Sequence, residues 1–152
     1  MPMPWAIRHA TKDWQAFLTD AKDRLDLTSD NSAYTAVDAV IQVFRRRLSV
    51  EEAIAFAQIL PACLRALFVQ DWNVTATPVP FATRDEMRRE AQAVRKDHNL
   101  TPDHAIEAVA WALRRHVRQR DLDDFLAQLP RGATDFWHVE TDDPRELHRR
   151  IT

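Results

Sequence analysis

The strongest constraint on the fold is an internal repeat, because the pattern that runs from Ala36 to Pro61 returns at Ala105 to Pro130 in one unbroken register. Every matching residue lies 69 positions after its counterpart. Each copy is a unit whose apolar face must be buried, and the sister copy is the natural surface to bury it. The identical pairs are Ala36/Ala105, Ala39/Ala108, Val40/Val109, Arg45/Arg114, Arg46/Arg115, Phe56/Phe125, Leu60/Leu129 and Pro61/Pro130.

The repeat sets the boundaries that we expect. Two similar helical units, of three to four helices each, occupy residues 11–72 and 83–138. The segment 73–82, which carries two prolines, is an extended connector, because proline disfavours helix at itself and at the residue before it. A helical tail follows at residues 142–150. We expect the whole chain, residues 1–152, to form a single domain in which the units pack as one pseudo-twofold helical bundle.

Glycine is nearly absent, and this favours an all-α fold. The chain has one Gly among 152 residues, whereas β-hairpins, bulges and tight turns need Gly for positive φ angles. Apolar residues make up 45% of the sequence, enough to fill a hydrophobic core. The composition therefore predicts an all-helical protein.

Capping residues mark the expected helix starts. Thr11 can begin the first helix, and Asn31 or Ser32 the second. The spacing of Ser49 to Glu52 and of Thr83 to Glu86 is that of a capping box. Two later helices are predicted to start at Thr101, which is followed by Pro102, and at Asp121.

Charge and cysteine usage exclude several classes of protein. The net charge of −2 and the pI near 6.3 give no general attraction to nucleic acid or to an anionic membrane. The lone Cys63 rules out an intrachain disulfide, and we expect it to be a small buried side chain. No stretch has the length of a membrane span, so we expect a soluble cytoplasmic protein.

Short phrases carry a resemblance to a known family. Residues 46–53 read Arg-Arg-Leu-Ser-Val-Glu-Glu-Ala, and residues 125–130 read Phe-Leu-Ala-Gln-Leu-Pro, followed by Phe136-Trp137. With the tandem arrangement, they make the chain similar to the bacterial family known as domain of unknown function 2267. The resemblance implies a two-repeat, all-helical bacterial protein of the cytosol, without an established activity or catalytic residues. Val50 stands where such proteins often have Gly.

Arginines recur near the end of the second helix of each unit. They form a candidate interaction surface if the twofold packing brings both groups to one side. They could then contact phosphates, although acidic neighbours and the helix dipole also explain them as a solvated, self-paired face. The set comprises Arg45, Arg46 and Arg47 in the first unit and Arg114, Arg115 and Arg118 in the second.

Trp111 is the aromatic residue that the core pattern explains least. It lies off the line of Ile106, Val109 and Leu113, and it corresponds to polar Gln42 in the first unit. We expect it to pack on the connector, with partner binding or closure of a small pocket as alternatives.

No pattern predicts catalysis, a cofactor or a metal. The spacing of His98 and His104, and of His138 and the acidic residues after it, matches no ligand pattern of known mechanics. There is no nucleophile elbow and no Gly-rich phosphate loop.

The leading functional hypothesis is a non-enzymatic interaction or scaffold module, which binds a protein partner or a second copy of itself. The second hypothesis is a nucleic-acid-binding protein that uses the duplicated arginines. An enzyme is third, and it would need a concave pocket with convergent titratable groups.

Overall fold

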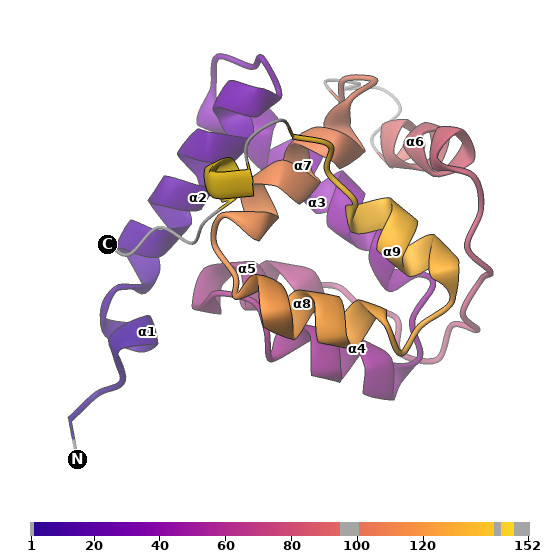
Figure 1. Ribbon diagram of the computed structural model, residues 1–152, viewed down its shortest axis with the longest axis horizontal. Coiled ribbons are helices and arrows are strands. Elements are labelled where there is room, and N and C mark those ends of the chain that lie inside the picture. The colour runs from indigo at the N-terminus through magenta and orange to yellow at the C-terminus, as the bar shows by residue number, and fades with distance from the viewer. Residues whose placement is uncertain (1, 95–100, 142–143, 148–152) are drawn as a thin grey trace.

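The computed structural model describes residues 2–94, 101–141 and 144–147, and every regular element in these ranges is a helix (Figure 1). The fold class is therefore all-α, as predicted. The first half contributes α1 (Trp5–Arg8), α2 (Ala10–Arg24), α3 (Asp30–Arg45), α4 (Val50–Ala57) and α5 (Ala62–Val69). The second half contributes α6 (Arg84–Ala93), α7 (Ala105–Arg114), α8 (Gln119–Leu126) and α9 (Arg131–Trp137), followed by a 3-10 turn at Pro144–Leu147.

Two of the predicted caps are present. Ser49 accepts a hydrogen bond from the Glu52 amide, while the Glu52 carboxylate accepts one from the Ser49 amide, which completes a capping box at α4. Thr83 accepts from the Glu86 amide and caps α6. These local pairs satisfy amide groups that the first helical turn leaves without a partner.

Other helix starts differ from the prediction. Ser29 caps α3 by accepting from the Ser32 amide, so Ser32 lies inside the helix rather than before it. The helices α2, α7 and α8 begin at Ala10, Ala105 and Gln119, each without a side-chain cap. Water can satisfy exposed helix amides, so a capping residue nearby need not set the start.

The predicted tail helix lies only partly within the described residues. Residues 144–147 form the 3-10 turn, whereas residues 142–143 and 148–150 lie outside them.

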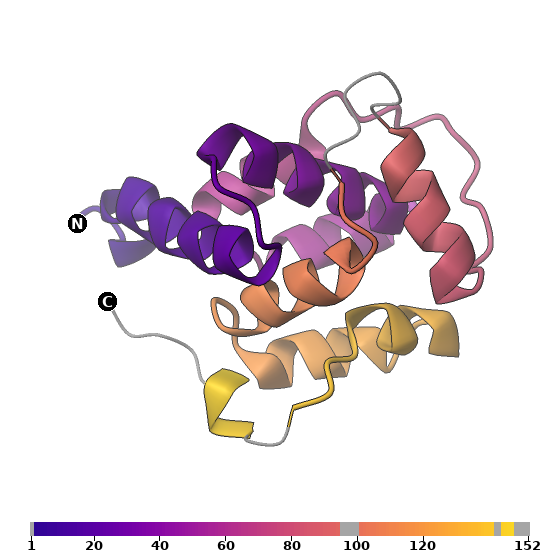
Figure 2. The same ribbon diagram turned by 90° about the horizontal axis from the view of Figure 1, so that it is seen from above.

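Helices of the first half pack directly against helices of the second half, so the halves share one interface rather than lying in a row. The α2 helix packs against α7 of the other half, and α3 packs against both α6 and α7 (Figure 2). The bounds of α4 and α8 match in the 69-residue register of the sequence. That the halves arose by duplication and follow a twofold axis stays a prediction.

An aromatic cluster fills the core where the halves meet. Phe44 packs its ring against Phe56 at 5.0 Å and against Phe136 and Trp137 at 5.2 Å, measured between ring centroids. All four side chains are buried. Trp5 lies outside this core and is 59% exposed in α1. Cys63 is only half-buried, with Sγ 3.6 Å from the Ala10 carbonyl oxygen.

Within the described ranges, no helix combines the length and apolar character needed to cross a membrane.

Candidate functional site

The first arginine of each group binds the end of a helix. Arg45 donates from Nη1 to the carbonyl oxygens of Phe68 and Gln70, at 2.8 and 3.0 Å, at the C-terminal end of α5. Arg114 donates from Nε to the carbonyl oxygen of Trp137, at 2.7 Å, at the end of α9. Burial lowers the pKa of the Arg45 guanidinium. Both side chains therefore satisfy helix carbonyls that have no partner inside the helix.

Arg46 and Arg47 converge on one carboxylate across the two halves. Arg47 is buried, and its two terminal nitrogens bind the two oxygens of Glu90 in α6. Arg46 is exposed and binds the same Glu90 at 3.2 Å. The hydrogen bond from Arg47, which outweighs the effect of partial burial, lowers the pKa of Glu90. This cluster joins α3 to α6.

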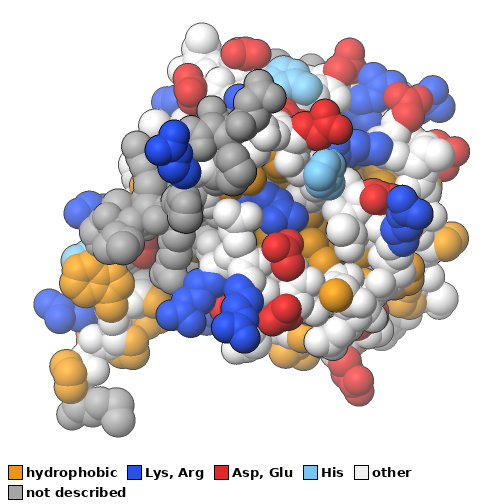
Figure 3. Space-filling model, in the orientation of Figure 1, with side chains coloured by type: hydrophobic (Ala, Val, Ile, Leu, Met, Phe, Trp, Pro, Cys, Tyr) orange, Lys and Arg blue, Asp and Glu red, His pale blue; other side chains and the backbone are white. Residues whose placement is uncertain are grey.

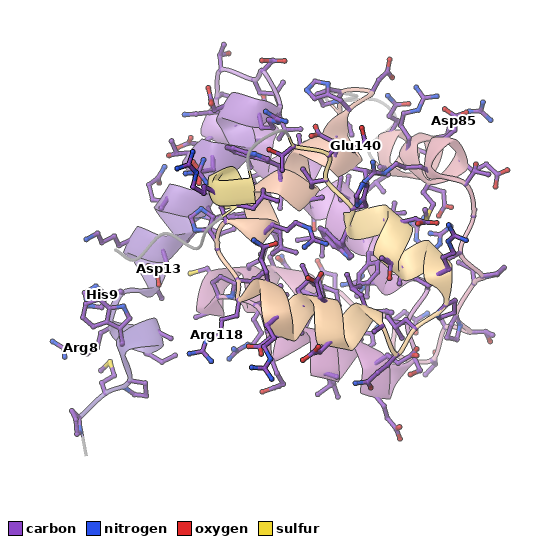
Figure 4. All side chains as sticks on the ribbon, viewed as in Figure 1. Arg8, His9, Asp13, Asp85, Arg118 and Glu140 are labelled. Atoms are coloured by element: carbon purple, nitrogen blue, oxygen red, sulfur yellow. The ribbon has the colours of Figure 1, made fainter. Side chains whose placement is uncertain are left out.

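Arg115 and Arg118 have different surroundings. Arg115 lies with its guanidinium carbon 4.7 Å from the Trp111 ring centroid and its Nε 3.7 Å from the Asp20 carboxylate. Arg118 is exposed at the start of α8, where Figure 4 shows it pointing away from the bundle. The basic and acidic side chains are mixed on the face in Figure 3. The structure thus places Arg45, Arg47 and Arg114 in internal contacts and leaves Arg46 and Arg118 exposed.

A buried polar contact joins the helices that form the main cross-half packing. Asp20 of α2 accepts at 2.7 Å from Nε2 of His116, which follows α7. Both side chains are nearly buried, at 10% and 7% exposed. The His116 ring also packs edge-on against Phe17, at 5.8 Å. The sequence patterns above did not predict this pair. A signal was present, since Asp20 lies three residues after Phe17 and so on the apolar face of α2.

Trp111 packs between charged groups of both halves. It is 7% exposed, and the Arg24 guanidinium carbon lies 5.0 Å from its ring centroid, close to the distance for Arg115. Arg24 also binds Glu107 of α7 at 3.1 Å. Cation–π contacts therefore hold the end of α2 against α7.

An open pocket of about 490 Å³ lies beside this Trp111 contact. It occurs where α2 ends and α7 begins, so segments far apart in the sequence form it together. His104 places Nε2 3.0 Å from the Arg24 carbonyl oxygen; because a carbonyl only accepts, this nitrogen carries the proton. Asp26 has a φ of 58° and its carboxylate lies 3.6 Å from the same nitrogen. The described lining residues are Asp23, Arg24, Asp26, His104, Glu107 and Trp111.

The pocket brings together titratable groups that the sequence did not connect. Among the lining residues, only Trp111 was a candidate site residue in the sequence. Closure of a small pocket was one of the alternatives to packing on the connector that its position suggested. The described lining contains no Ser, Thr, Cys or Lys to act as a nucleophile. Among the described residues, no group of three or more His, Cys, Asp and Glu side chains is placed to hold a metal ion. The arrangement is a pocket lined mainly by charged side chains.

The fold and these contacts define an all-helical bundle whose halves are joined by arginine contacts to helix ends and by polar pairs between helices. The chain belongs to the family of uncharacterized conserved proteins named DUF2267, whose model matches residues 14–136. This match confirms the predicted family. A comparison with curated proteins finds no match.

Proposed function

We propose that this chain is a non-enzymatic interaction module of the bacterial cytosol, which binds another protein through its N-terminal segment, residues 3–7. The observation that carries the proposal is the exposure of three large apolar side chains there. Met3, Trp5 and Ile7 are 58%, 59% and 53% exposed. Apolar side chains that gather on a surface commonly mark a protein contact.

The shape of this segment suits a docking element. The α1 helix contains no buried residue and projects from the bundle, with hydrophobic side chains gathered at the lower left of Figure 3. Trp5 is held by stacking on His9, with ring centroids 3.7 Å apart. A tryptophan held in one orientation loses little entropy on binding, and tryptophan is enriched among the residues that dominate interface energies.

The test is a triple variant, Met3→Ser with Trp5→Ser and Ile7→Ser, compared with the wild-type chain in sedimentation velocity and in capture from a nuclease-treated host lysate. The matched control is Val74→Ser with Val79→Ser, which changes two exposed apolar residues of the connector. We expect the triple variant alone to lose self-association or a captured protein, with an unchanged unfolding midpoint. Equal association by all three chains would contradict the proposal.

Nothing in the geometry favours the nucleic-acid alternative, which stays a prediction. Alanine at Arg45 or Arg114 would remove contacts to helix ends, so loss of binding in such variants would not separate folding from recognition. The exposed residues Arg46 and Arg118 offer the cleaner test. Salt-sensitive duplex binding that weakens in Arg46→Ala with Arg118→Ala would support this alternative.

The pocket beside Trp111 meets the geometric condition for the enzyme alternative, since titratable groups do converge there. Its histidine and Glu107 are engaged with Arg24, however, and the described lining has no Ser, Thr, Cys or Lys side chain. The contacts support binding better than catalysis.

A further inference from the structure

We infer that the partner of the docking segment, residues 3–7, is a second copy of this chain, which offers the exposed face of α4 as the receiving surface. The inference rests on the proposed function, because it names the protein that this segment contacts. One molecule carries two exposed apolar surfaces, and the charges around them are of opposite sign. A contact between them is heterologous, since each copy contributes a different surface.

The docking segment continues into a basic surface. Arg8 and Lys12 are both exposed and follow the three apolar side chains of the segment. They line an open pocket of about 620 Å³, whose described lining contains no Asp or Glu. Neither cation has an ion-pair partner among the described residues. Figure 4 shows Arg8 pointing away from the bundle. The segment therefore presents apolar side chains beside two positive charges that a partner can pair.

The exposed face of α4 has the complementary character. Val50 and Ile54 are large exposed apolar residues, and their spacing of four places them on one face of the helix. Glu51 borders this face three residues before Ile54, is exposed, and has no ion-pair partner within the described part of the chain. Glu52 is different, because its carboxylate completes the capping box. The face thus combines apolar side chains with a carboxylate that is available to a partner.

The neighbouring helix strengthens the negative charge of this region. The α8 helix packs against α4, and it exposes Asp121 and Asp124. Across the two helices, two glutamates and three aspartates stand against one arginine, Arg120. Complementary charge favours docking of the basic segment here. The same argument disfavours a contact between two docking segments, because both are positively charged.

The positions of the two surfaces require two molecules for the contact. Figure 1 shows α1 projecting from one end of the bundle, whereas α4 lies apart from it along the lower edge. The segment of one molecule therefore leaves its own α4 face uncovered, and each copy has both a docking segment and a receiving face.

The experiment is sedimentation velocity of the purified full chain, up to about 0.5 mM to reach weak affinities. The segment variant is the triple serine variant at Met3, Trp5 and Ile7. The face variant is Val50→Ser with Ile54→Ser, and the connector variant Val74→Ser with Val79→Ser is the matched control. The decisive sample is an equimolar mixture of the segment variant and the face variant. Unfolding midpoints check that each variant is folded.

We expect the wild type and the connector variant to self-associate, and more weakly at high salt, which screens exposed charges. The segment variant and the face variant should each associate at least about tenfold more weakly, because apolar burial is lost. Their mixture should recover association, since one chain supplies an intact segment and the other an intact face. Glu51→Lys should also weaken association, by placing a cation opposite Arg8 and Lys12.

The inference is overturned if the wild type stays monomeric, if the face variant associates as the wild type does, or if the mixture stays monomeric. A monomeric wild type that still captures a host protein through residues 3–7 would overturn this inference alone and leave the proposed function standing. Binding of the monomer to phosphatidylglycerol vesicles through the same residues would assign the segment to a lipid surface instead, and would overturn both.

Discussion

Arg114 donates a hydrogen bond from Nε to the backbone carbonyl oxygen of Trp137, at 2.7 Å, and its Nη1 lies 3.2 Å from Asp123. The same guanidinium thus contacts the end of α9 and the side of α8. Arg45 makes the corresponding contact to Phe68 in the first half, at the position that the 69-residue register assigns. Two of the repeated arginines that first suggested a binding surface, Arg45 and Arg114, therefore donate hydrogen bonds to carbonyl oxygens at helix C-terminal ends.

Arg114→Ala should destabilise the fold by about 2–4 kcal/mol, because it leaves the Trp137 carbonyl without its charged donor and opens a buried space. Arg114→Lys should recover only part of this, since a lysine cannot reproduce the planar contact to several acceptors. Urea unfolding followed by circular dichroism measures both. The control is Arg118→Ala, an exposed residue that should change stability by less than about 0.5 kcal/mol. A loss for Arg118→Ala equal to that for Arg114→Ala would contradict the assignment.

Glu90→Gln should remove part of the acid sensitivity of the fold. The pKa of Glu90 is lowered in the folded chain, chiefly by the Arg47 hydrogen bond, so its stabilising effect is complete above its ordinary value of 4.5. That effect is lost as the pH falls from 4.5 through the lowered value. The free energy of unfolding, measured from pH 7 to pH 3, should therefore fall less steeply in this pH window for Glu90→Gln. At pH 7 the variant should be about 1–3 kcal/mol less stable, because the buried Arg47 loses its charged partner. Parallel pH profiles for both chains would show that Glu90 is not the group responsible.

Gly132→Ala should destabilise the chain by about 1–3 kcal/mol, although alanine normally favours a helix. The only glycine in the sequence lies in the first turn of α9. A methyl group there would come 2.4 Å from the Cβ of Phe81 in the connector, which is closer than atoms can approach.

The matched comparison introduces Phe81→Ala into the wild-type chain and into the Gly132→Ala variant. The effect of Gly132→Ala should shrink or change sign when the Phe81 ring is absent, and a double-mutant cycle of unfolding free energies measures this coupling. If the two substitutions change the free energy of unfolding additively, a steric clash between residue 132 and Phe81 is not the cause.

Asp26→Gly should stabilise the chain by about 0.5–1 kcal/mol. Asp26 has a left-handed φ of 58°, which glycine adopts at no steric cost. The Asp26 and Leu27 amides donate back to the Asp23 and Lys22 carbonyl oxygens, the pattern with which many helices end. Asp26→Ala is the control and should gain nothing or lose up to about 1 kcal/mol, since alanine keeps the Cβ that disfavours this conformation and lacks the short polar side chain with which aspartate tolerates it. Thermal unfolding that ranks alanine above glycine would contradict the reading of this turn.

Much of the fold was predictable from local patterns. The scarcity of glycine and the helical spacing of apolar residues predicted the all-α class, and the capping box at Ser49 predicted one of the helix starts. The family also followed from short phrases. Helix starts without a side-chain cap, such as Ala10 and Gln119, were misplaced because no residue type marks them.

The sequence by itself determined which segments are helical and which residues recur, because helix periodicity and the repeat are properties of neighbouring positions along the chain. Only the tertiary structure decided what the polar residues do. Asp20 meets His116, and His104 meets Arg24, across separations of 96 and 80 residues. Such pairs depend on how α2 packs against α7, and a side chain's type does not reveal which distant carbonyl or carboxylate the packing will place beside it. The pocket at this junction exists for the same reason.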